Sequence, residues 1–484
     1  MGAGCAPSAM CVGEPNFQGE QVSDEKRGFA YLKQVLIGAG SGLLAIVVLV
    51  VLTSFGGSAN PNPSNSISQT TASSETPSAT PTDGRTCSVN DLALDPRLAT
   101  FSGAVINAAT GEVLFDRNAA VPAATASVMK VVTAAAALQA LGPNYVVDTK
   151  VYADPANPGT IILVGGGDPT LSATAPGQQS VYANAPKLSD LAVKVSQWAT
   201  DNSVKVTQIV LDSTLFAGGT AASKWESSWE RSEQTQGFMS EVTALQVDGD
   251  RASPSRETSP RSTTPVMNAG RKFKAALGAT ATGATLVEGK LPAGATEVAK
   301  VTSQTIDKWI KHMLLVSDNT EAEYLARLIA IKQGYDGSFA SIGIAIKKSL
   351  AATNLDTSNL IIKDGSGLSA NNAVPPLFIA KLFGLVLEGF NDFEVIGQGL
   401  PVSGESGSLA DRFKGANLDA VGKVQAKTGW IKTGYTLGGI IKAKDSTNLL
   451  FAVYALGNVK DDAKQAIDDL VTGFYRCGNT LSNQ

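Results

Sequence analysis

A serine and a lysine three residues apart, Ser127 and Lys130, are the residues of this sequence best placed for covalent chemistry. They precede an alanine-rich run, 131–141, that is predicted to form a helix capped by Thr125 and ended by Gly142. Since residues three apart share one face of a helix, the two side chains are expected to meet. A serine hydroxyl attacks only after a base removes its proton, and a neutral lysine is such a base. A free lysine titrates near ~10.4, so its pKa must fall by roughly three units, through burial or a neighbouring cation.

The pair alone is a weak signal, because Ser23 and Lys26 repeat the same spacing. Two further motifs accompany Ser127. The run S-D-N at 317–319 lies between two predicted helices, and K-T-G at 427–429 continues a predicted strand. A second K-T-G, at 432–434, falls where the chain must turn between two strands, so it is interpreted as a hairpin turn.

The composition excludes several kinds of enzyme and partner. The chain of 484 residues has a formal net charge of −4, which does not indicate a nucleic-acid-binding surface. It contains one histidine, His312, so a zinc site of the H-E-x-x-H type is impossible. A Ser-His-Asp triad would have to use His312, which lies in a helical pattern and is predicted to be a partly buried structural residue. A hydrolase of this sequence therefore needs another base, and lysine qualifies.

The N-terminal part of the chain predicts a membrane anchor. Residues 1–33 are polar and are expected to form a cytoplasmic tail, and 34–55 are free of charge and long enough to cross a bilayer. The basic residues that place this flank in the cytoplasm are Lys26, Arg27 and Lys33. A cleaved signal peptide, with a weak site at 57–59, is the alternative. Residues 56–86, rich in Ser, Thr and Pro, predict a disordered linker. The prediction is a single-pass cell-membrane protein whose folded part lies on the extracellular, wall side.

The remaining chain predicts an α+β fold whose sheet joins the two ends of the folded region. The predicted strands are a hairpin at 102–116, then 145–152, 160–164, 205–211, 421–430, 435–443 and 448–455, and the predicted helices include 188–202, 305–316, 320–333 and 461–474. The glycine-rich run 165–171 is expected either to line a cleft or to form a tight turn. The segment 246–265 is full of Ser, Pro and charged residues and is expected to be an exposed loop.

The four cysteines divide according to this topology. Cys5 and Cys11 belong to the predicted cytoplasmic tail and should stay reduced, whereas Cys87 and Cys477 lie outside, where disulfides persist. Because the predicted sheet brings the two ends together, Cys87 and Cys477 are predicted to form a disulfide. Two unrelated thiols are the alternative.

Taken together, the motifs resemble those of the D-alanyl-D-alanine carboxypeptidases of the peptidase S13 type, the class C low-molecular-mass penicillin-binding proteins. The matching runs are 126–130, 165–169, 317–323, 364–369, 400–404 and 426–429. The resemblance implies a serine β-lactamase/transpeptidase-like domain made of 87–149 and 287–484, with a domain inserted at 150–286 between the first and second motifs. Monomeric β-lactamases have a much shorter interval there.

The resemblance also implies roles for the motif residues. Ser127 would attack the carbonyl of the penultimate D-alanine of a peptidoglycan stem peptide, Lys130 would take its proton, and Ser317 would relay a proton to the leaving amine. Lys427 would add positive charge that lowers the pKa of Lys130. The residues expected to bind substrate are Asn319, Lys427, Thr428, Gly429 and Trp430. The backbone N–H groups of Ser127 and Trp430 would form the oxyanion hole.

The predicted function is therefore a serine-type D-Ala-D-Ala carboxypeptidase, or also an endopeptidase of the same bond type, that is acylated by β-lactams and needs no metal or organic cofactor. A β-lactamase or β-lactam-sensing relative and a catalytically silent wall-binding protein are the alternatives.

One departure from the sequence pattern of the family bears on substrate choice. In the family the run matching 364–369 is usually followed by an arginine that suits an acidic third stem residue, and here Ala370 follows. The hypothesis is a stem with lysine, or another residue without that carboxylate, at position three.

Overall fold

The computed structural model describes residues 84–483. The predicted cytoplasmic tail (1–33), membrane anchor (34–55) and nearly all of the predicted linker (56–86) lie outside the described residues. Within residues 84–483, none of the helices has the length and apolar character needed to cross a membrane.

The larger part of the structure is built on a five-stranded antiparallel sheet with the strand order β3-β2-β11-β10-β9. Its strands are β2 (Thr100–Asn107), β3 (Val113–Arg117), β9 (Val424–Ile431), β10 (Gly434–Lys442) and β11 (Asn448–Leu456). Because Ala104 of β2 lies opposite Ala452 of β11, the first and last parts of the folded chain share one sheet. The predicted N-terminal hairpin, the three C-terminal strands and the α+β class are confirmed.

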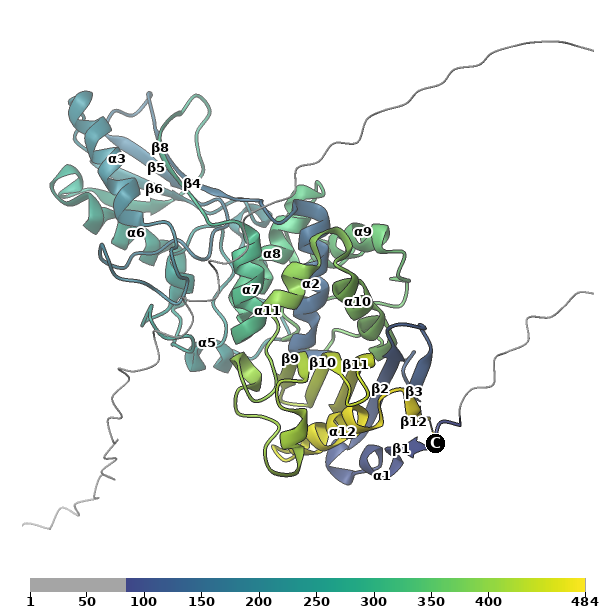
Figure 1. The fold of residues 1–484 in the computed structure, drawn as a ribbon. Helices are drawn as coiled ribbons and strands as arrows, with labels where there is room; N and C mark the ends of the chain where they lie inside the picture. Colours follow the sequence, from purple (N-terminus) through teal and green to yellow (C-terminus); the bar gives the residue numbers. More distant parts are fainter. Residues whose placement is uncertain (1–83, 484) are drawn as a thin grey trace, which may run out of the picture. The chain divides into compact units, whose positions relative to one another are not determined.

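Helices cover both faces of this sheet (Figure 1). Alternate residues of β2 point to opposite cores: Ile106 joins the larger helical layer and Val105 the smaller one. The helices of the larger layer are α2 (Met129–Leu141), α7 (Ile306–Val316), α8 (Asn319–Lys332), α9 (Phe339–Ser349), α10 (Pro376–Glu388) and α11 (Glu394–Gly399). On the other face lie α1 (Asn90–Ala93) and α12 (Ala463–Cys477). Helix α2 is apolar on all sides and is buried from Met129 to Leu138, as expected for a helix at the centre of a domain.

A second five-stranded sheet, in the order β7-β6-β5-β4-β8, is formed by the chain between the first two motifs. Its strands are β4 (Asp148–Ala153), β5 (Thr160–Val164), β6 (Gln208–Asp212), β7 (Thr285–Glu288) and β8 (Thr296–Thr302). The helices of this region are α3 (Leu188–Asp201), α4 (Ala221–Lys224), α5 (Ser232–Gln236) and α6 (Pro265–Leu277). Since β8 pairs with β4, the sheet extends from Asp148 to Thr302, beyond the predicted limits 150–286 of the insertion.

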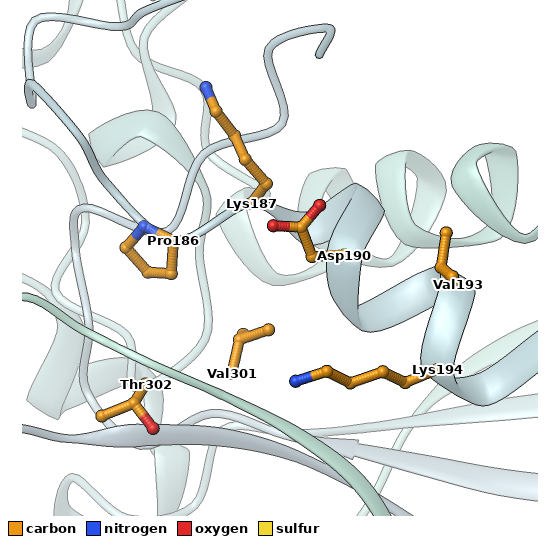
Figure 2. Close-up of a pocket in the computed structure, with 7 residues that line it drawn as sticks. All are labelled: Pro186, Lys187, Asp190, Val193, Lys194, Val301 and Thr302. Carbon is orange, nitrogen blue, oxygen red and sulfur yellow. The ribbon is translucent and has the colours of Figure 1, made fainter. Parts of the chain in front are cut away.

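A hollow of about 590 Å³ lies between the N-terminal half of α3 and β8 (Figure 2). Its lining includes two lysines. Lys187 Nζ donates to the Gln178 carbonyl at 2.6 Å, and Lys194 Nζ donates to the Lys300 carbonyl at 2.8 Å. Both amines thus hold neighbouring backbone in place.

Two loop predictions for this region have different outcomes. The run 165–171 continues as a buried turn in which Asp168 Oδ1 accepts a hydrogen bond from Thr170 N at 2.8 Å. The prediction that 246–265 is an exposed loop is right only in part: residues 255–258 are exposed, but Gln246, Asp248 and Arg251 are buried. Of the charged residues that indicated exposure, Arg251 is instead paired with Asp318 inside the protein.

The two ends of the folded chain are joined covalently. Cys87 and Cys477 form a disulfide, with their Cα atoms 5.4 Å apart, as predicted. Beside it, β1 (Cys87–Ser88) pairs in parallel with β12 (Leu481–Ser482).

Removing this disulfide is expected to lower the free energy of unfolding by about 3 kcal/mol, because a bond across a long loop restricts the unfolded chain. The loop here has a sequence separation of 390. Urea unfolding of the double variant Cys87→Ser/Cys477→Ser, compared with the parent, measures the loss. A reductant should weaken the parent and leave the double variant unchanged. Equal urea midpoints for parent and variant would contradict the prediction.

Candidate active site

The predicted site residues converge on one cavity of about 880 Å³. Six of them line it: Ser127, Ser317, Asn319, Thr428, Gly429 and Trp430. The side chains of Lys130 and Lys427 are fully buried beside it, and each contacts a serine of its wall. The structure therefore brings together every residue that the three motifs predicted, although Ser127 and Lys427 are 300 positions apart in the sequence.

Ser127 lies in a 3₁₀ turn, Ala126–Val128, that leads directly into α2. The prediction that Thr125 caps the helix with its side chain is wrong, since its hydroxyl accepts no capping hydrogen bond. Thr125 has helical rather than extended backbone angles (φ −87°, ψ −17°), which aim the side chain away from the free N–H groups. Its carbonyl instead accepts hydrogen bonds from Val128 N at 3.2 Å and Thr436 Oγ1 at 2.7 Å, which fixes the turn to β10.

Two glycines let other segments approach this turn closely. Gly367 has a left-handed backbone (φ +84°), and a Cβ atom there would overlap the carbonyl oxygen of Ala126. Gly429, in β9, lies close to the same turn, and a Cβ atom there would lie 2.9 Å from Ser127 N. Since glycine has no Cβ, the N–H of Ser127 stays free to bind an oxygen of the substrate.

Lys130 is in direct contact with Ser127. Its Nζ lies 2.9 Å from Ser127 Oγ and donates to Asn319 Oδ1 at 2.7 Å and to the Ser366 carbonyl at 2.8 Å. Burial lowers the pKa of Lys130 to about 8, although the carboxylates of Asp364, Asp318 and Glu323 oppose the change. Because of this contact and its lowered pKa, the neutral form of Lys130 could accept a proton from Ser127.

Lys427 holds the second motif against the third. Its Nζ donates to Ser317 Oγ at 2.8 Å and to the Thr428 carbonyl at 2.7 Å. Burial, and next the charge of Lys130, keep the pKa of Lys427 well below its usual range. The charges of Lys130 and Lys427 repel each other, as predicted, but the largest cause of the lowered pKa of Lys130 is its burial. The hydroxyl of Thr428 lies 2.6 Å from that of Ser408 at the cavity wall.

The S-D-N motif occupies the junction between α7 and α8. Ser317 ends α7 in the left-handed conformation (φ +67°), and Asp318 caps α8 by accepting a hydrogen bond from Glu321 N at 3.1 Å. Asn319 contacts Lys130 through Oδ1 and donates from Nδ2 to the Phe238 carbonyl at 3.1 Å. The three side chains of the motif thus point to three different sets of partners.

One wall of the cavity was not predicted from the sequence. It is formed by the segment around α5 and includes Ser228, Trp229, Glu230, Glu233 and Phe238. Trp229 anchors this wall by donating from Nε1 to Asp364 Oδ2 at 2.8 Å. The only sequence signal for it is a pair of tryptophans, Trp225 and Trp229, in an otherwise polar stretch.

Glu323, also missed, supports the floor of the site. Its Oε1 accepts hydrogen bonds from Gly365 N at 3.0 Å and Ser366 N at 2.7 Å, and so fixes the carbonyl of Ser366 that Lys130 contacts.

The prediction that the second K-T-G, at 432–434, forms a hairpin turn is confirmed. Strand β9 ends at Ile431 and β10 begins at Gly434, which leaves Lys432 in the turn.

Within residues 84–483, one group of side chains has the spacing of a metal site: ligand atoms of His312, Asp318 and Glu321 lie within 4.8 Å of one another. These atoms already have partners. His312, which is partly buried as predicted, lies between Glu321 at 2.7 Å and Glu257 at 3.1 Å, and Asp318 is paired with Arg251. The neighbouring carboxylates, opposed by burial, raise the pKa of His312 to about 11, so its protonated form does not offer a lone pair to a cation.

Comparison with known proteins agrees with this geometry. Residues 86–259 and 250–475 match the D-Ala-D-Ala carboxypeptidase 3 (S13) family. A carboxypeptidase of Mycobacterium tuberculosis is 32% identical over 409 residues, which cover 84% of this chain and 86% of that protein. The carboxypeptidase DacB of Mycolicibacterium smegmatis is 32% identical over 387 residues, covering 79% of this chain and 82% of that protein.

Among solved structures, penicillin binding protein 4 of Haemophilus influenzae has the same fold, with a TM-score of 0.65 at 19% identity and coverage of 80% of this chain and 99% of that one. The family match spans most of the folded chain, and the two mycobacterial relatives match over most of their own length. As its motifs indicated, the chain belongs to the D-Ala-D-Ala carboxypeptidase 3 (S13) family of peptidases.

Proposed function

We propose that this carboxypeptidase is a serine-type enzyme that removes the terminal D-alanine from peptidoglycan stem peptides through an acyl-enzyme on Ser127. The observation that carries the proposal is the contact of 2.9 Å between Ser127 Oγ and the buried amine of Lys130. A lysine whose pKa is about 8 spends part of its time neutral near pH 7, which an exposed lysine does not.

In the first half-reaction, Ser127 Oγ loses its proton to Lys130 and forms a bond to the carbonyl carbon of the penultimate D-alanine. The oxyanion is held by the backbone N–H groups of Ser127 and Trp430, an arrangement typically worth about 10²–10³ in rate. The C–N bond then breaks, and the leaving amine takes the proton of Ser317. The terminal carboxylate of the substrate favours the protonated form of Lys427, which lies 2.8 Å from Ser317 Oγ and resupplies that proton.

In the second half-reaction, water attacks the ester and Lys130 returns its proton to Ser127 Oγ, while the proton of the water restores Lys427 through Ser317. Lys427 and Thr428 bind the terminal carboxylate of the substrate, and Asn319 holds its backbone. A β-lactam would follow the same first half-reaction and remain as the ester.

Labelling with a fluorescent penicillin tests the proposal. We expect a stable adduct on the full chain that mass mapping places on Ser127, and release of D-alanine from a synthetic stem pentapeptide. Rapid turnover of the drug would indicate a β-lactamase instead. The absence of both an adduct and D-alanine release would indicate a catalytically silent, wall-binding protein.

We further propose that residues 34–55 anchor the chain in the cell membrane as one helix, with the carboxypeptidase on the wall side. The support is the charge-free sequence of this segment and the basic residues before it. Protease treatment of intact cells should digest the folded part and spare the tail 1–33. A folded part that is protected from the protease would contradict this orientation.

The pH dependence of acylation follows from Lys130. Because the base acts when it is neutral, the acylation rate should rise about tenfold between pH 7 and pH 9, as a lysine with a pKa of about 8 loses its proton. Stopped-flow labelling with a fluorescent penicillin measures this rate. A rate independent of pH over this range would show that Lys130 is not the base.

Ala370 lines the cavity, as the hypothesis about the third stem residue requires. We expect kcat/KM to be about tenfold higher for a lysine pentapeptide than for a diaminopimelate pentapeptide, since Ala370 has no guanidinium to pair with the extra carboxylate. Ala370→Arg should reverse the preference, and Ala370→Leu, which adds bulk without charge, should not. A parent enzyme that prefers the diaminopimelate peptide would show that this position does not set the choice.

A further inference from the structure

Arg251 connects the segment that was expected to be exposed with the S-D-N motif. Its side chain is 1% exposed. Nη2 donates to Asp318 Oδ2 at 2.6 Å, Nη1 to Tyr182 Oη at 2.7 Å and Nε to the Glu257 carbonyl at 3.2 Å. A guanidinium presents its donors in a fixed planar fork, so three partners in three directions define its position.

Asp318 receives this guanidinium at the centre of the motif. Its side chain is 2% exposed, and Oδ2 also accepts a hydrogen bond from Tyr182 Oη at 3.1 Å. Although burial opposes it, the charge of Arg251, and next the charges of His312 and Arg261, hold the pKa of Asp318 below its usual range. The carboxylate is therefore ionised, buried and dependent on Arg251 for its main counter-charge. Breaking such a pair by removing one partner leaves an uncompensated buried charge, which is strongly unfavourable.

The residues on either side of Asp318 are those that face the chemistry. Ser317 has a left-handed backbone, which costs a non-glycine residue about 1–2 kcal/mol, so the surrounding contacts must maintain it. Its Oγ accepts from Lys427, and Asn319 Oδ1 accepts from Lys130. Asp318 lies between them on the same short turn, and its Oδ2 accepts hydrogen bonds from Arg251 and Tyr182.

We propose that Arg251 is a positioning residue for the acylation step: by holding Asp318, it sets Ser317 and Asn319 against the two catalytic-site lysines. The inference rests on the proposed acyl-enzyme function and adds to it a residue from outside the three motifs. The geometry of the second motif then depends on the segment 246–265, which folds with the inserted region.

A neighbouring arginine provides a matched control. Arg261 is equally buried (7% exposed, as is Arg251 over the whole residue) and belongs to the same segment. Its guanidinium donates to the backbone carbonyls of Ser259, Gly249 and Gly237, and not to the motif. If removing a buried arginine slowed acylation only by destabilising this segment, Arg251→Met and Arg261→Met should therefore slow it equally.

The experiment uses the full chain and a chromogenic β-lactam in stopped flow, which separates the limiting acylation rate from the dissociation constant of the non-covalent complex. We expect Arg251→Met to lower the limiting rate about 30-fold or more, with the dissociation constant changed by less than about threefold, because misplacement of positioned groups acts on the chemical step. Arg251→Lys, which keeps the charge, should recover part of the rate. Arg261→Met should acylate within about threefold of the parent at a temperature where circular dichroism shows all variants folded.

An Arg251→Met rate within about threefold of the parent would overturn the inference, and so would an equal loss in Arg261→Met. If Arg251→Met does not fold, Tyr182→Phe decides, since it removes one hydrogen bond to Asp318 and one from Arg251. A limiting rate lowered at least about threefold in folded Tyr182→Phe supports the inference, and a smaller change overturns it. A parent that is not acylated on Ser127 refutes the proposed function itself, whereas an acylated parent with an unaffected Arg251→Met refutes this inference alone.

Discussion

Lys130→Arg is expected to acylate about 10³-fold more slowly than the parent, or slower still, at every pH between about 6 and 10. Arginine keeps its positive charge throughout this range, so it cannot accept the proton of Ser127. The three acceptors around Nζ, which are Ser127 Oγ, Asn319 Oδ1 and the Ser366 carbonyl, suit a cation and would still accept hydrogen bonds from the guanidinium. The fold should therefore persist while the reaction stops.

Labelling by a fluorescent penicillin over hours measures the residual rate, with Ser127→Ala as the reference for no reaction. Lys363→Arg is a suitable control, since Lys363 is an exposed lysine close in sequence to the 364–369 run. A Lys130→Arg enzyme that acylates at a near-normal rate would remove Lys130 from the role of base. If Lys130→Arg loses its secondary structure, Lys130→Gln takes its place in the test, because glutamine is smaller and also cannot act as a base at these pH values.

Gly367→Ala is expected to lower the free energy of unfolding by about 3 kcal/mol or more, through overpacking and an unfavourable left-handed alanine. A methyl group at Gly367 would overlap the carbonyl oxygen of Ala126 and come within 2.8 Å of Met129 Cβ, so the nucleophile turn must move. Acylation of the protein that remains folded should fall about 100-fold, because displacement of a reacting atom by about 1 Å costs that much.

Gly415→Ala is the matched control, since Gly415 is also left-handed (φ +62°) but nothing lies within 4 Å of its added Cβ. It should lose only about 1 kcal/mol, from the backbone conformation alone. Urea unfolding and penicillin labelling of both variants separate the two effects. Equal losses in the two variants would mean that the contact between Gly367 and Ala126 does not matter.

The sequence was sufficient to identify the three motifs because each depends on local spacing. Ser127 and Lys130 meet because they are one helical turn apart, and Lys432 forms a turn because strands flank it. The strand pattern also predicted that the two ends of the folded chain would meet, and the disulfide between Cys87 and Cys477 followed from it.

What the sequence did not reveal depends on contacts between distant segments. From the sequence alone, the charged residues of 246–265 indicate exposure. The burial of Arg251 is explained only by its contact with Asp318, which lies 67 residues later in the chain. The lowered pKa of Lys130 was expected from burial or from a neighbouring cation, but the distant segments that bury this side chain could not be identified from the sequence. In both cases the environment of a charged side chain depends on segments that are distant in the sequence.

The sheet order β3-β2-β11-β10-β9 has a consequence for how the protein is made. Strand β2 is synthesised near the start of the folded region and its neighbour β11 near the end, so at about 5–20 residues per second β2 waits roughly 20–70 s for its partner. Until then the apolar helix α2 lacks part of the core that buries it, and the turn bearing Ser127 lacks its contact with Thr436 of β10. An incomplete chain therefore contains Ser127 but lacks the late strands that complete the site. The contacts of Lys427 with Ser317 and of Thr436 with the Ser127 turn can form only after these late strands have been synthesised.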